Sequence, residues 1–173
     1  MKSPAILVLA LCLAPVAHAA GPSPIAAAKN ENQRAATSLG VATAWKLQLG
    51  LIGDDCAKAD PAHAAERQQT YRRWTRSNRA TLDRVDRYLH DVAPVLFAKE
   101  TPKGADAIKL LEAQTVTALD AKLAAIPKDQ KATFCSRYGE MAVQFDGKSD
   151  ALLQEAFAAL DRWKAAHLHA AAK

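Results

Sequence analysis

Three arginines and a tryptophan in one short stretch have the chemistry of a protein-contact surface. Arg72, Arg73 and Arg76 carry cations that bind carboxylates through forked hydrogen bonds, and Trp74 lies between them. Arginine and tryptophan are common among the residues that dominate interface energies. None of the three arginines has an acidic residue three or four positions away, which is the spacing of ion pairs along a helix. We therefore predict that these four residues contact a protein partner with an acidic surface.

A solvated face held by ion pairs is the alternative for this basic stretch. It suits the following residues better, because acidic and basic side chains alternate there at steps of four. These residues are Arg79, Asp83, Arg87 and Asp91. Upstream, Arg67 has only the adjacent Glu66 as an acidic neighbour, and Tyr71 offers a second aromatic anchor for a partner.

Histidines near carboxylates could bind a metal ion. Asp83, Asp86 and His90 share one side of a predicted helix, but this side flanks the apolar stripe, so a surface ion pair is the simpler interpretation. His167 and His169 could bind copper or nickel weakly near the end of the chain. Neither the Glu-x-x-His motif of di-metal bundles nor the Cys-x-x-Cys-His motif of covalent haem occurs in the sequence. We predict neither a metal centre nor a cofactor.

A group of acidic residues, Asp54, Asp55 and Asp60, could contact a cation, although a solvated turn explains it equally well. Motifs of nucleophilic or metal-assisted catalysis are absent from the sequence, including His-Glu-x-x-His, Gly-x-Ser-x-Gly and Ser-x-x-Lys. We therefore predict a protein that is not an enzyme.

The amino-terminal residues have the pattern of a secretory signal peptide. Lys2 precedes an apolar run that is too short to span a bilayer, and Ala17-His18-Ala19 is a small-x-small cleavage site. This pattern predicts a signal peptide over residues 1–19, one domain over residues 20–173, and a periplasmic or secreted protein. Export makes nucleic acid an unlikely partner class, whereas the mildly basic mature chain is compatible with weak contact to an anionic membrane surface.

Cleavage of the signal peptide would remove Cys12 and leave Cys56 and Cys135 as a pair. In an oxidising compartment such a pair forms a disulfide by default, and a loop of this length gives about 4 kcal/mol of stabilisation. Free or reactive thiols are the alternative, but the Cys-x-x-Cys spacing of redox sites is missing. We predict a structural disulfide between Cys56 and Cys135.

Helices must position all of these residues. Apolar side chains recur at steps of three and four through most of the mature chain, and no stretch shows the sustained alternation typical of strands. Helix-start signals and prolines divide the pattern into a single-domain, all-α, antiparallel bundle of about five helices. The expected helices cover residues 24–52, 61–93, 102–126, 127–145 and 150–167, with Cys56 in the loop after the first helix.

Together these features predict an exported, non-enzymatic interaction protein of unknown oligomeric state. Inhibitors, immunity proteins against periplasmic toxins and periplasmic chaperones share this general format, which carries no residue from one protein to another. The alternative is a carrier that holds a small ligand or a metal between its helices.

Overall fold

The computed structural model describes residues 21–101 and 104–168, and within these residues the chain is all-helical. Residues 1–19, where the signal peptide is predicted, lie outside the described part, as does His169. The described residues form seven α-helices and one 3₁₀ turn: α1 (Glu31–Ala59), η1 (Pro61–His63), α2 (Ala64–Ser77), α3 (Arg79–Leu96), α4 (Gly104–Ala124), α5 (Lys128–Ser136), α6 (Tyr138–Gln144) and α7 (Ala151–His167).

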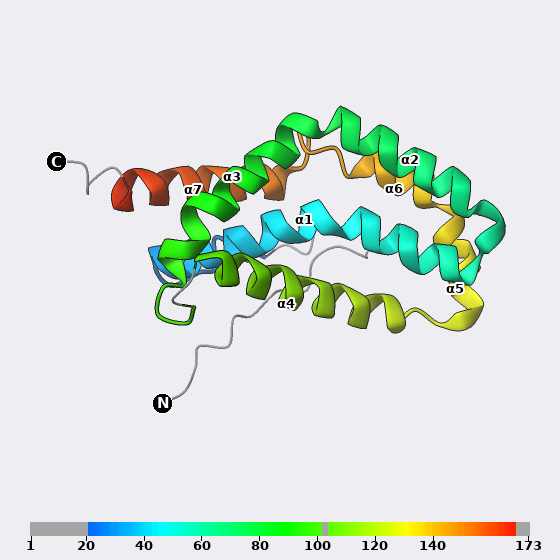
Figure 1. The fold of residues 1–173 in the computed structure, drawn as a ribbon, viewed down its shortest axis with the longest axis horizontal. Helices are drawn as coiled ribbons and strands as arrows, with labels where there is room; N and C mark the ends of the chain where they lie inside the picture. The colour runs from blue at the N-terminus through cyan, green and yellow to red at the C-terminus, as the bar shows by residue number, and fades with distance from the viewer. Residues whose placement is uncertain (1–20, 102–103, 169–173) are drawn as a thin grey trace.

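Helix α1 is the centre of the fold (Figure 1) and contacts each of the other six described α-helices. The Asn30 side chain caps its first turn by accepting a hydrogen bond from the Gln33 amide at 2.8 Å. Buried residues lie along its whole length, from Ala35 to Cys56. Because other helices surround α1, it buries residues on several sides, where the sequence predicted a single apolar stripe.

The remaining helices cover different parts of α1. Near the amino-terminal end of α1, Asn32 accepts a hydrogen bond from the Trp163 indole of α7 at 2.8 Å. Val41 of α1 packs with Ala156 of α7. Near its carboxyl-terminal end, α5 and α6 approach through the disulfide and through the Tyr138 hydroxyl, which donates to the Leu49 carbonyl at 2.9 Å.

The expected helix over residues 61–93 is two helices, α2 and α3, which meet at Asn78. This buried side chain donates to the Trp74 carbonyl at 3.1 Å and accepts from the Gly147 amide at 2.9 Å, so it ties the junction to the α6–α7 loop. Asn competes well with helical backbone bonds because its short amide reaches nearby main-chain groups. The sequence predicts that Pro94 ends or kinks this helix; the helix does not end there, because α3 continues to Leu96.

Two other boundaries also differ from expectation. The chain makes a turn near Ser23 and Pro24, but the helix itself starts at Glu31. The expected helix over residues 127–145 divides at Arg137 into α5 and α6. This division lets Cys135 and Tyr138, on the two pieces, both reach α1.

The predicted disulfide between Cys56 and Cys135 is confirmed, with a Cα–Cα distance of 5.4 Å. Cys56 lies in the last turns of α1 and not in a following loop, so the bond joins the ends of two helices. Both residues are buried, at 0% and 2% exposure.

Candidate functional site

The three arginines predicted to contact a partner lie on the outer surface of α2. Arg72, Arg73 and Arg76 are all exposed. Within the described residues none of them makes an ion pair, and the single side-chain hydrogen bond among them joins Arg73 to the Thr70 hydroxyl at 3.2 Å. We call these three residues the arginine strip. It is a cationic surface whose charges are left to solvent.

Trp74, the fourth predicted contact residue, belongs to the core. It is 4% exposed, and its indole N–H donates to the Phe145 carbonyl at 2.7 Å. Its ring lies 5.2 Å from the ring of Trp45 and 5.8 Å from that of Tyr71. Trp74 therefore fixes α2 to the body of the protein, and we leave it out of the proposed contact surface.

Arg67 has a structural role that its position in the sequence did not indicate. Its side chain is 7% exposed, and its guanidinium donates to the Asp60 carbonyl at 2.8 Å, to the Cys56 carbonyl at 3.3 Å and to the Asp60 carboxylate at 2.5 Å. Carbonyls at the end of a helix lack intrahelical partners, and a cation there also complements the helix dipole. Arg67 of α2 thus caps the carboxyl-terminal end of α1.

Asp60 is the centre of this capping group. His63 binds the same carboxylate oxygen at 2.7 Å. The hydrogen bond from His63, followed by that from Arg67, lowers the pKa of Asp60 against the opposing effect of burial. Asp60 therefore stabilises the turn that joins α1 to α2. Asp55, another residue of the predicted acidic group, pairs with Lys131 at 2.5 Å.

Ion pairs around α3 run between helices, where the sequence suggested pairs along one helix. Of Arg79, Asp83, Arg87 and Asp91, Asp91 is the one member that makes an ion pair among the described residues. Asp161 of α7 accepts from Arg84 at 2.9 Å and from the Tyr88 hydroxyl at 2.6 Å, while Asp91 pairs with Lys164 at 2.5 Å. Burial and the Asp161 carboxylate together raise the pKa of Tyr88 to about 12. These contacts connect α3 to α7.

The side of α3 considered for metal binding is engaged in another ion-pair group. Asp86 accepts from Lys46 of α1 at 2.8 Å, and Glu112 of α4 accepts from the same ammonium at 3.1 Å. Burial alone would lower the pKa of Lys46, but its hydrogen bonds to the two carboxylates raise it overall. His167 stacks on Trp163 with a centroid distance of 4.5 Å. Among the described residues, no group of three histidine, cysteine or carboxylate side chains could hold a metal ion.

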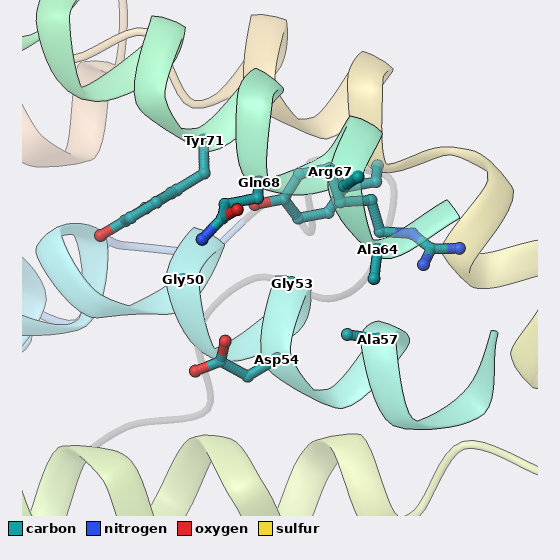
Figure 2. Close-up of a pocket in the computed structure, with 10 residues that line it drawn as sticks. Gly50, Gly53, Asp54, Ala57, Ala64, Arg67, Gln68 and Tyr71 are labelled. Carbon is teal, nitrogen blue, oxygen red and sulfur yellow. The ribbon is translucent and has the colours of Figure 1, made fainter. Parts of the chain in front are cut away.

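A groove of about 590 Å³ lies between α1 and the first turns of α2 (Figure 2). The groove stays open because small residues of both helices line it, where larger side chains would fill the space. These residues are Gly50, Gly53, Ala57, Ala64 and Ala65. An added Cβ at Gly50 would lie 3.3 Å from the Tyr71 hydroxyl oxygen, and one at Gly53 would lie 2.9 Å from that of Tyr138. We call this feature the α1–α2 groove.

Larger side chains complete the α1–α2 groove. Figure 2 shows Tyr71 and Gln68 extending from α2 toward α1, while Arg67 extends away from Gly50. Asp54 lines it from α1, and Tyr138 is a further lining residue. Burial raises the pKa of the Tyr138 phenol, with smaller contributions from Tyr71 and Asp54.

The sequence analysis missed the α1–α2 groove. The small residues on α1 stand three and four positions apart, and Ala64 and Ala65 open the next long helix. That spacing was visible in the sequence, but nothing in it showed that the two sets face each other.

Comparisons with protein-family models, with curated proteins and with solved structures find no match to this chain. No helix in residues 21–101 and 104–168 combines the length and apolarity needed to cross a membrane.

Proposed function

We propose that this protein is an exported, non-enzymatic interaction protein that binds an acidic surface of another protein through Arg72, Arg73 and Arg76. The observation that carries the proposal is that these three exposed cations have no carboxylate partner within the described residues. Arg67 on the same helix is paired, with a carboxylate that lies seven positions away in the sequence. Arg79 and Arg87 on α3 are also exposed and make no ion pair within the described residues, but each has a carboxylate four positions away, whereas the three arginines of the strip have none.

The arginine strip also stands on a well-anchored helix. Trp74, between two of its members, is fixed by a hydrogen bond and by two aromatic neighbours, and Arg67 holds the start of α2 against the end of α1. A rigid display reduces the conformational entropy lost on binding. An inhibitor or an immunity protein would act through such a stoichiometric contact, and the disulfide suits the oxidising compartment in which we place the protein.

The test is a triple charge reversal, Arg72→Glu, Arg73→Glu and Arg76→Glu. The mature protein and the variant are immobilised and exposed to a periplasmic extract of the source organism. We expect the wild type to retain a specific protein at stoichiometric amounts and the variant to lose it. Because exposed substitutions usually change stability by less than about 0.5 kcal/mol each, thermal unfolding should stay close to that of the wild type.

A matched control reverses three exposed lysines elsewhere, Lys99→Glu, Lys109→Glu and Lys128→Glu, and so changes the net charge equally. Retention of the partner by both variants would overturn the proposal. So would arginine-dependent binding to vesicles containing phosphatidylglycerol without capture of a protein, since that result would indicate a membrane surface as the partner.

The second candidate is a small-ligand carrier, and the α1–α2 groove is the observation that favours it. Its volume of about 590 Å³ falls in the range of small-molecule sites. Mass spectrometry and absorption spectra of protein purified from its native compartment would test this function, and a chain without a bound ligand would count against it.

A further inference from the structure

The charges that line the α1–α2 groove do not balance. Arg67 is the one lining cation, and its charge is neutralised by Asp60, outside the lining. Asp54 is the one lining carboxylate, it is exposed, and within the described residues it makes no ion pair. The lining of the α1–α2 groove therefore carries one carboxylate without an ion pair, on a protein whose neighbouring helix face is positive.

Two further polar groups in the α1–α2 groove have no hydrogen-bond partner among the described side chains and backbone. They are the Gln68 amide and the Tyr71 hydroxyl, both on α2 (Figure 2). Each can accept a hydrogen bond from a cationic donor. With the Asp54 carboxylate they form a set of acceptors around an otherwise apolar space.

The walls of the α1–α2 groove suit an aliphatic chain. Tyr71 and Tyr138 cover Gly50 and Gly53, so the apolar lining consists of these two rings and the methyl groups of Ala57, Ala64 and Ala65. Long basic side chains bury their methylene stems against such surfaces while the charged end meets a carboxylate, and an aromatic ring adds to the attraction of a cation.

We propose that the α1–α2 groove binds a lysine or arginine side chain of the partner protein, with its cation at Asp54 and its stem against the methyl groups of Ala57 and Ala64. This inference rests on the proposed function, because the same partner supplies the acidic residues that contact the arginine strip. The recognised surface is thus one basic residue among acidic ones. An arginine strip alone would select any acidic surface, so the α1–α2 groove would supply the specificity.

The experiment uses two peptides as probes. One is acetyl-Glu-Glu-Lys-Glu-Glu-amide, and the other has norleucine, which keeps the stem and lacks the charge, in place of lysine. Each is titrated into the ¹⁵N-labelled mature protein and followed by NMR. We expect saturable shifts at the amides of Gly50, Gly53 and Gln68 with the lysine peptide, and at least tenfold weaker binding of the norleucine peptide. Equal affinities, or shifts confined to other residues, would overturn the inference.

Two variants test separately the negative charge of Asp54 and the open space of the α1–α2 groove. Asp54→Asn should bring the lysine peptide to the affinity of the norleucine peptide, whereas Asp83→Asn, at an exposed carboxylate on α3, should leave it unchanged. Ala65→Trp should block the α1–α2 groove and weaken both peptides, whereas Ala158→Trp, at an exposed alanine on α7, should not. Failure of both Asp54→Asn and Ala65→Trp to weaken binding would refute the site.

The design distinguishes failure of this inference from failure of the proposed function. In the Arg72, Arg73 and Arg76 triple reversal, both peptides should bind more weakly while the ratio of their affinities is retained. Unchanged affinities with the ratio retained would contradict the arginine strip alone. A ratio of one in the wild type would contradict the groove alone. Binding of cadaverine as tight as that of the lysine peptide would overturn the protein partner in favour of a small amine.

Discussion

Removal of the Arg67 side chain tests whether this residue, like its exposed neighbours, is a surface cation or holds two helices together. Its guanidinium makes three contacts at the end of α1, at 2.5, 2.8 and 3.3 Å. Met matches the aliphatic stem of Arg and has no charge, so Arg67→Met keeps much of the packing of the stem and deletes these contacts. Asp60 stays accessible to water, with 33% of its side chain exposed, so it is not left as a buried, unpaired charge.

The magnitude follows from these contacts. A hydrogen bond from a charged group to a main-chain carbonyl contributes about 1.5–3 kcal/mol, and the ion pair with the partly exposed Asp60 adds less than about 1 kcal/mol. The Cys56 carbonyl also accepts from the Asp60 amide at 2.9 Å, so it keeps a partner in the variant and contributes less to the loss. We expect Arg67→Met to lower the free energy of unfolding by about 2–4 kcal/mol.

Urea unfolding of the oxidised mature protein, followed by circular dichroism, measures this change. Arg72→Met on the same helix is the matched control, and its exposed, unpaired side chain predicts a change within about 0.5 kcal/mol. Arg67→Lys should fall between the two, since an ammonium keeps the charge and loses the fork that reaches several acceptors. Equal stabilities of the two methionine variants would refute the capping role.

Three other predictions concern the stability of the fold. Gly147→Ala should cost about 1–3 kcal/mol in urea unfolding, because the new Cβ would lie 2.7 Å from the Trp45 ring, whereas Gly139→Ala, where nothing lies within 4 Å, should cost far less. The pKa of Tyr88 is raised from 10.0 to about 12 in the folded protein. The protonated phenol therefore contributes fully to the free energy of unfolding below pH 10, and this contribution is lost as the pH rises toward 12. Tyr88→Phe should flatten that alkaline decline in the thermal unfolding temperature. Reduction of the disulfide, which closes a loop with a sequence separation of 79, should destabilise the protein by about 4 kcal/mol in the same urea assay, and an unchanged midpoint would contradict its structural role.

Local signals were sufficient for the class of fold. Apolar residues at helical spacing predicted helices throughout, and two cysteines remaining after the predicted cleavage predicted the disulfide, both of which are confirmed. Helix boundaries were predicted less well. The division at Asn78 depends on a hydrogen bond to Gly147, which lies 69 residues further along the chain, so no local pattern could reveal it.

The candidate site shows the same limit. Sequence spacing correctly indicated that Arg72, Arg73 and Arg76 lack acidic neighbours on their own helix. It treated Arg67 and Trp74 as similar surface residues, although both are buried. A helical pattern alone did not settle which side of α2 faces α1, since that side is itself polar at Arg67 and Gln68.

The sequence by itself determined the helical content, the cysteine pair and the excess of arginine on one helix, because each depends on residue type and on spacing within a few turns. Only the tertiary structure decided which of those arginines remain unpaired and where a groove opens. Ion pairs and close approaches between helices join residues far apart in the chain, and their energies depend on distances that exist only after the helices have packed. The arginine strip and the α1–α2 groove are therefore properties of the folded protein.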